Sequence, residues 1–373
     1  MCKISRYQSL FLALLAMPLL GACQIFWQDN PGTPDASIDA GSRCIGDGDA
    51  GVNRDIDILF VIDNSGSMFE EQASLAANFP NFMSVLDNIQ GGLPNVHIGV
   101  VSSNVGVGGY NIAGCGGDGD NGELQNVARG ACTPPSGKFI SDVASASGTT
   151  RVRNYEGTLA DTFSCISRLG TSGCAFEQHL ESMKRALEPF QTVNAGFLRE
   201  HAYLAVVFIA DEDDCSAGNS SVYDPNDTAL TSTLGPLESF RCTEFGITCA
   251  EGNLTRNAAS YTQCRPRTDS YLRNPQDYVD FLKNLKCDPS KILVAGIVGN
   301  PDPVRVTFND MGHPQLAHSC LDPSGIGGAA DPAVRLKYVL DQFPGSTMTS
   351  ICNNDLSSAL QKIAEQFAAT IGH

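Results

Sequence analysis

Basic residues and known catalytic motifs are both scarce in this sequence. Its 373 residues include 24 Lys and Arg against 41 Asp and Glu, which gives a net charge of −17 at pH 7. This excess of negative charge argues against nucleic acid or anionic lipid headgroups as partners, and it suits the binding of divalent cations. The sequence contains no Gly-x-Ser-x-Gly, His-Glu-x-x-His or Gly-x-x-x-x-Gly-Lys motif. We therefore expect no enzyme activity, with metal-assisted hydrolysis as a minor alternative.

The apolar run at the start of the chain is too short to cross a bilayer. It covers residues 10–20, follows Lys3 and Arg6, and leads into a Leu-Gly-Ala-Cys segment that ends at Cys23. A charged start, a short apolar run and small residues are typical of a secretory signal peptide, here residues 1–22. Loss of its two basic residues would leave 22 Lys and Arg against 41 acids, a net charge near −19.

The Leu-Gly-Ala-Cys segment resembles the lipobox of bacterial lipoproteins. The resemblance implies that Cys23 becomes the lipidated first residue and anchors the protein to a membrane. Gln24 follows it in place of aspartate, which by resemblance to Gram-negative lipoproteins favours the outer membrane. The alternative is an ordinary cleavage site with an incidental cysteine. Residues 23–53 are rich in Asp, Gly, Pro and Ala and predict a flexible tether.

None of the cysteines forms a Cys-x-x-Cys pair, and no histidines stand at zinc-binding spacing. Of 14 cysteines, Cys2 would be lost with the signal peptide and Cys23 would carry lipid, which leaves an even number. Disulfides formed in an oxidising compartment are the favoured interpretation. Connectivity cannot be deduced from sequence, but proximity makes three pairings plausible: Cys115–Cys132, Cys165–Cys174 and Cys320–Cys352.

A buried strand followed by three regularly spaced oxygen ligands is the central feature of the sequence. The apolar run from Ile56 to Ile62 predicts a strand buried on both faces, and a helical pattern begins soon after it. Asp63, Ser65 and Ser67 stand between them, at the strand end where α/β sheets bind ligands. Such oxygens suit Mg²⁺, Mn²⁺ or Ca²⁺. Alternatively, the serines cap the helix and the aspartate makes a turn.

The Asp-Asn-Ser-Gly-Ser segment at 63–67 resembles the metal-ion-dependent adhesion site of von Willebrand factor A domains. This resemblance implies a doubly wound, mostly parallel α/β sheet between helices. It also implies that a threonine from a second loop and an aspartate after a later strand help to hold the metal. An acidic side chain of a partner would complete the coordination.

Two further segments match the expected second and third loops. Gly-Thr-Ser-Gly at 170–173 precedes a helical pattern, so the resemblance makes Thr171 the candidate ligand and Ser172 the reserve, although the loop looks longer than the family's. A helix cap is the alternative. The strand from Tyr203 to Ala210 ends at Asp211, which matches the third-loop aspartate. The acids that follow it form a second shell, a second metal site or a solvated turn: Glu212, Asp213 and Asp214.

Strand and helix patterns alternate from residue 54 to residue 373, as in a parallel α/β domain. We expect this domain to carry disulfide-stapled insertions at about 105–136, 216–273 and 300–330. The first contains Asp118 and Asp120, which form a calcium site or a solvated loop. The second either shapes what the metal crevice binds or covers it, and the third is expected to be a loop.

The cysteine-rich, lipidated layout resembles the von Willebrand A lipoproteins of myxobacteria and relatives, which include a gliding-motility adhesin of the outer membrane. The sequence therefore suggests a lipid-anchored module of the cell envelope that binds a protein or surface ligand carrying a carboxylate through a metal ion. The alternative is a structural envelope lipoprotein in which the metal only orders loops.

Overall fold

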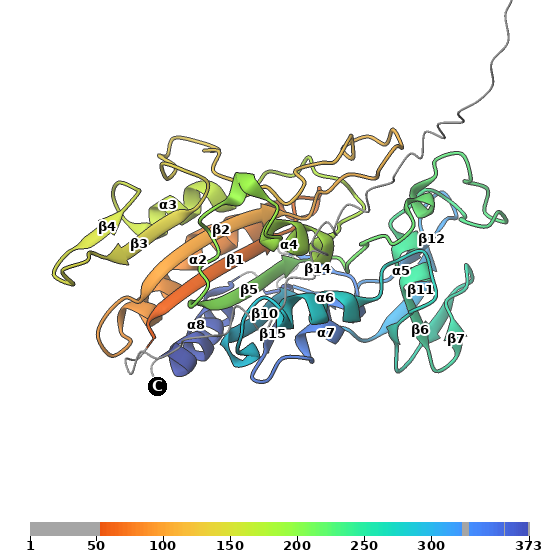
Figure 1. Ribbon diagram of the computed structural model, residues 1–373. Helices are drawn as coiled ribbons and strands as arrows, with labels where there is room; N and C mark the ends of the chain where they lie inside the picture. Colours follow the sequence, from red (N-terminus) through yellow and green to blue (C-terminus); the bar gives the residue numbers. More distant parts are fainter. Residues whose placement is uncertain (1–52, 323–327, 354, 372–373) are drawn as a thin grey trace, which may run out of the picture. The chain divides into compact units, whose positions relative to one another are not determined.

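The computed structural model describes residues 53–322, 328–353 and 355–371. Seven strands form its central sheet: β1 (Asp55–Ile62), β2 (Asn95–Ser102), β3 (Ile140–Ala144), β4 (Arg151–Arg153), β5 (Tyr203–Ala210), β10 (Ile292–Val298) and β15 (Thr347–Ser350). Their order is β15–β10–β5–β1–β2–β3–β4 (Figure 1). The first five in this order are parallel, and β3 and β4 are antiparallel additions at one edge. The doubly wound, mostly parallel sheet that we predicted is confirmed.

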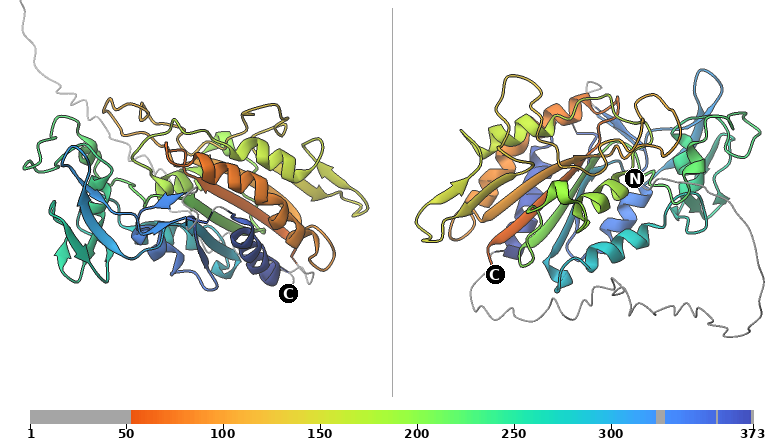
Figure 2. Two further views of the ribbon diagram at one scale, coloured as in Figure 1. Left: turned by 180° about the vertical axis from the view of Figure 1, so that it is seen from behind. Right: turned by 45° about the horizontal axis from the view of Figure 1, so that its top comes forward.

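Alternate residues of the strands face two separate hydrophobic cores, because side chains along a strand point to opposite faces. In β1, Ile58 and Phe60 belong to one core, while Leu59 and Val61 belong to the other. Helices cover both faces of the sheet (Figures 1 and 2). The first core is closed by α2 (Phe69–Asp87), α3 (Leu159–Ser167) and α8 (Ser357–Ile371), and the second by α4 (His179–Leu187), α6 (Pro275–Lys283) and α7 (Val334–Leu340).

The second and third insertions fold together. One small antiparallel sheet joins β8 (Ala259–Tyr261) of the second insertion to β11 (Val304–Phe308) and β12 (Pro314–Leu316) of the third. The remaining short elements are α5 (Phe240–Gly246), β6 (Ile247–Cys249), β7 (Gly252–Asn253), β9 (Arg265–Pro266), β13 (Cys320–Leu321), β14 (Ala329–Ala330), η1 (Thr192–Asn194), η2 (Ser220–Tyr223) and η3 (Pro289–Lys291). Our expectation of a loop over 300–330 is therefore wrong. Its strand β11 pairs with β8, which precedes it by about 40 residues of chain, and the other strands pair within the insertion, β12 with β11 and β13 with β14.

Five disulfides link the described residues: Cys115–Cys174, Cys132–Cys165, Cys215–Cys242, Cys249–Cys264 and Cys320–Cys352. Cys287 is also disulfide-bonded. The pairing Cys320–Cys352 is confirmed, whereas Cys115–Cys132 and Cys165–Cys174 are wrong. The four cysteines exchange partners because the folded loops bring Cα atoms within 4.4 Å and 5.7 Å in the other combination.

The predicted signal peptide, the lipidation site Cys23 and almost all of the predicted tether lie in residues 1–52, outside the described part of the chain. Within residues 53–322, 328–353 and 355–371, no helix combines the length and the apolar character that a membrane span needs.

Candidate metal centre

The end of β1 positions the first group of candidate ligands. Ile62 pairs with Ile209 of the parallel neighbour β5, and the Asp63 amide donates to the Ile209 carbonyl at 2.9 Å. Asp63 is fully buried, and its Oδ1 accepts a hydrogen bond from the Ser65 amide at 2.7 Å. The hydroxyls of Ser65 and Ser67 lie 3.1 Å apart. One carboxylate and two hydroxyls therefore face the crevice where the sheet changes its winding direction, as the sequence suggested.

Hydrogen bonds hold the second loop against this turn. The Gln72 side chain donates to the carbonyls of Asp63 and Gly170, at 2.8 and 3.0 Å, and accepts from the Gly170 amide at 3.1 Å. The Gly173 amide donates to the Asn64 carbonyl at 2.8 Å. Thr171 and Ser172 are the two residues of the chain between these anchor points, so the candidate second-loop ligand belongs to a loop that is fixed at both ends. Gln72 gave no signal in the sequence, since its role depends on a loop 98 residues away.

Gly173 and a disulfide fix the path of this loop. A Cβ atom at Gly173 would overlap the Asn64 side chain, so only glycine fits this close approach. Cys174, the next residue, is bonded to Cys115 of the first insertion. That insertion also contains Asp120, whose carboxylate accepts a hydrogen bond from the Ser102 hydroxyl at 2.6 Å. The Gly-rich insertion is therefore linked covalently to the second loop and restrains it.

Asp211 follows β5 and is the second buried carboxylate of the site, only 3% exposed. Burial, with the charge of Asp63 as the next cause, raises the pKa of Asp211 to about 8, and a hydrogen bond with Ser67 opposes this rise. Among the described residues, Asp63 Oδ2 and Asp211 Oδ1 are buried without a hydrogen-bond partner. Two neighbouring carboxylates with unsatisfied oxygens carry a free-energy cost that a bound cation would remove. The residues present thus fit the group that the sequence resemblance implies.

His179 lies next to Asp63, which no pattern in the sequence indicated. Its Nε2 is 3.4 Å from Asp63 Oδ2, and both side chains are fully buried. Burial lowers the pKa of His179, but the carboxylate of Asp63 outweighs this and the net pKa is raised. Asp63 and His179 are far apart in the sequence, so no local sequence pattern could predict this contact.

A single imidazolium does not balance the acids around it. Besides Asp63 and Asp211, Glu71 of α2 is 4% exposed and its Oε2 has no hydrogen-bond partner among the described residues. Burial raises the pKa of Glu71, and the charges of Glu70 and Asp63 add to the rise. The site therefore retains an excess of acidic groups even if His179 is protonated. No three Asp, Glu, His or Cys side chains in the described ranges are grouped to hold a metal by themselves, so the serine and threonine hydroxyls are essential to any site here.

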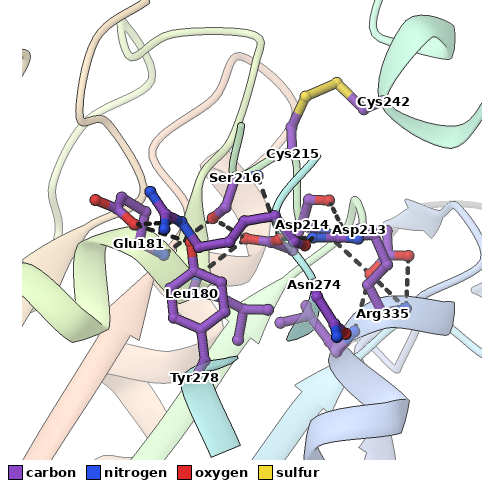
Figure 3. Close-up of polar contacts among 12 residues, drawn as sticks. Leu180, Glu181, Asp213, Asp214, Cys215, Ser216, Cys242, Asn274, Tyr278 and Arg335 are labelled. Carbon is purple, nitrogen blue, oxygen red and sulfur yellow. Dashed lines mark hydrogen bonds and ion pairs between the residues drawn. A yellow bond between two sulfur atoms is a disulfide. The ribbon is translucent and has the colours of Figure 1, made fainter. Parts of the chain in front are cut away.

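Asp213 and Asp214 have structural partners. Asp214 is fully buried: its Oδ1 accepts from the Leu180 amide at 2.9 Å and the Ser216 hydroxyl at 2.6 Å, and its Oδ2 accepts from Arg335 Nη2 at 3.0 Å (Figure 3). The Asp213 carboxylate accepts from the Arg335 amide at 2.8 Å. The two aspartates thus bind the N-terminal amides of α4 and α7, where negative charge is stabilising. Of the three alternatives that the sequence left open for these acids, the solvated turn is therefore wrong for Asp213 and Asp214.

Comparisons with known proteins add little to this geometry. No family model matches the chain, and no curated protein matches it. Among solved structures, the pilus adhesin SpaC from Lactobacillus rhamnosus GG is similar with a TM-score of 0.36 and 11% identity, over 86% of this chain and 30% of that one. The conserved hypothetical protein BatB from Bacteroides thetaiotaomicron has a TM-score of 0.33 and 10% identity, over 84% and 98%.

The pilus adhesin RrgA from Streptococcus pneumoniae is similar at a TM-score of 0.33 and 11% identity, and the match covers 84% of this chain and 44% of RrgA. The chain therefore spans less than half of either adhesin. Likenesses this weak assign no function to the chain.

Proposed function

We propose that this protein is a metal-dependent adhesion or protein-binding module that engages an acidic group of a partner. The observation that carries the proposal is the pair of buried aspartates, Asp63 and Asp211, each with an oxygen that accepts no hydrogen bond. His179 lies 3.4 Å from this oxygen of Asp63 and supplies one positive charge to the two acids. They lie beside the Ser65 and Ser67 hydroxyls at the crevice of a doubly wound sheet. Hard divalent cations prefer this set of ligands.

In this proposal, Ser65, Ser67 and Thr171 bind Mg²⁺, Mn²⁺ or Ca²⁺ directly, and Asp63 and Asp211 contact it directly or through water. The bound ion would supply the positive charge that attracts a partner carboxylate. The hydroxyls are neutral ligands and leave more positive charge on the ion than a set of carboxylates would. Phe69, which is 68% exposed and follows the Ser67 turn by two residues, offers an apolar contact next to the site.

The alternative, a structural lipoprotein whose metal only orders loops, explains less. The second loop is already attached to the β1 turn by the Gln72 and Gly173 hydrogen bonds, so a metal is not needed to order it. Metal-assisted hydrolysis remains the minor alternative. Full burial of His179 makes it a poor group for exchanging protons with a substrate, and we expect no catalytic activity.

Partner capture from envelope extracts tests the proposal. The purified protein should retain a partner with Mg²⁺ present and lose it in EDTA, and Asp63→Ala should retain none. Asp269→Asn removes a carboxylate that is 86% exposed and serves as the matched control, with capture unchanged. Blocking the carboxylates of the partner by amidation should also abolish capture. Capture that survives both EDTA and Asp63→Ala would refute the proposal.

We also propose that the protein is anchored by lipid on Cys23 at the outer membrane. This part of the proposal derives from the signal sequence and the lipobox, and from the disulfide-rich fold, which suits an exported protein.

A further inference from the structure

A cavity of about 190 Å³ lies between the turn after β5 and the second and third insertions. Its lining includes Glu177 and Glu212 as well as Phe240 and Leu316 of the insertions. The cavity adjoins the metal centre, because the amide of its lining residue Asp331 donates to the Asp211 carbonyl at 2.8 Å. None of the five candidate metal ligands lines it, however, so the cavity is a separate site.

The lining of this cavity contains more acidic than basic side chains. Glu177 is 1% exposed, and its Oε1 has no hydrogen-bond partner among the described residues. The Glu212 and Glu177 carboxyls share a hydrogen bond. Asp331 is already engaged, since it pairs with His318 at 2.9 Å. Among the described residues that line the cavity, none is lysine or arginine. A buried acceptor left without a donor is unfavourable, and a cationic ligand in the cavity would satisfy it.

The size and the walls of the cavity indicate which cation fits. The volume exceeds the roughly 150 Å³ of a cavity that accommodates benzene, so a group of six to eight heavy atoms can enter. Phe240 and Leu316 are 5% and 8% exposed and form apolar walls, while Gln315 and His318 are exposed at the surface. An alkyl stem packs against apolar walls, and a guanidinium or ammonium head donates several hydrogen bonds to carboxylates. Phe240 and Leu316 offer no ligand atoms to a bare metal ion, whereas they can pack against an alkyl stem.

We propose that this cavity binds an alkyl guanidinium or alkyl ammonium group. Glu177 and Glu212 accept the hydrogen bonds of the cationic head, and Phe240 and Leu316 contact its alkyl stem. The group belongs either to a free small amine or to an arginine or lysine side chain of a protein partner. The proposal does not depend on the metal centre, so either can fail without the other.

Calorimetric titration of the purified protein tests this proposal. The two cationic probes are agmatine, a free amine, and the blocked peptide acetyl-Gly-Arg-Gly-amide; the neutral probe is the same peptide with citrulline in place of arginine. We expect saturable binding of at least one cationic probe and none of the neutral one. Glu177→Gln should weaken that binding at least tenfold. Glu200→Gln makes the same chemical change at an exposed position outside the cavity and should leave binding unchanged.

A second variant separates loss of binding from loss of the fold. Leu316→Trp fills the cavity from its apolar wall and leaves both carboxylates in place, so it should also weaken binding while the thermal transition persists. Binding of agmatine alone would identify a free amine as the ligand, and binding of the arginine peptide would identify a partner side chain. Equal binding of the citrulline peptide, or no binding of either cation by the folded protein, would overturn the proposal. So would Ca²⁺ uptake that Glu177→Gln abolishes without any guanidinium binding.

Discussion

Replacing Arg335 with methionine should destabilise the fold strongly, because Arg335 forms the central ion pair of the turn after β5. Its side chain is fully buried, with Nη2 donating to Asp214 Oδ2 at 3.0 Å and to the Arg273 carbonyl at 2.8 Å, and Nε donating to the Asp214 carbonyl at 2.9 Å (Figure 3). Removing one partner of a buried pair leaves an uncompensated charge and costs ~3–5 kcal/mol. Leu180 and Ser216 still donate to Asp214, so we expect the lower end of that range.

The corresponding fall in Tm is about 5 °C, from ~3 kcal/mol divided by the entropy of unfolding of a domain this large. Thermal unfolding followed by calorimetry, with the disulfides intact, measures it. Arg305→Met makes the same change at an exposed position of β11 and should alter the free energy of unfolding by less than ~0.5 kcal/mol. The double variant Arg335→Met/Asp214→Asn should recover part of the lost free energy of unfolding, because it no longer buries the unpaired charge of Asp214. An unchanged Tm for Arg335→Met would show that this buried pair does not stabilise the turn.

Three further predictions concern the site and the anchor. Gly173→Ala should weaken Mg²⁺ binding about tenfold, roughly 1.4 kcal/mol, because the added Cβ pushes the second loop away from Asn64. Gly116→Ala, where a Cβ meets no atom within 4 Å, is the control. Equal Mg²⁺ affinities of Gly173→Ala and the unaltered protein would contradict the role given to the loop. The raised pKa of Asp211 means that the folded apo protein holds a proton more tightly than the unfolded chain, so in EDTA its free energy of unfolding should be highest near pH 4 and fall as pH rises to about 8. Urea unfolding across this range with and without Mg²⁺ checks this, and a pH profile that Mg²⁺ leaves unaltered would count against the metal. Cys23→Ala should abolish incorporation of labelled palmitate and release the protein from membranes, whereas continued labelling would place the anchor elsewhere.

The buried parallel strands of the central sheet could be predicted from sequence because each is a local pattern, whereas the edge strands β3 and β4 could not. The apolar runs of β1 and β5 are buried on both faces and end at the expected residues, Ile62 and Ala210. The turn from Asp63 to Ser67 lies within one such pattern, so its position at the crevice could also be predicted. Buried parallel strands show this signal more clearly than other elements do.

Contacts between distant segments could not be predicted in this way. Arg335 reaches Asp214 across 121 residues, so the sequence showed a run of acids but not the buried base beside it. His179 near Asp63 and the exchanged cysteine partners have the same cause. The strands of the third insertion were missed because they are short, two to five residues each, and because β11 pairs with a strand of another insertion.

Magnesium uptake by the purified protein tests the central claim most directly. Calorimetry on EDTA-stripped protein should show one Mg²⁺ bound per chain, retained in Asp269→Asn and lost in both Asp63→Asn and Asp211→Asn, while the thermal transitions of all three variants persist. If folded protein takes up no Mg²⁺, Mn²⁺ or Ca²⁺, or if the two crevice variants bind as tightly as the unaltered chain, the buried aspartates have another purpose and the adhesion proposal is wrong.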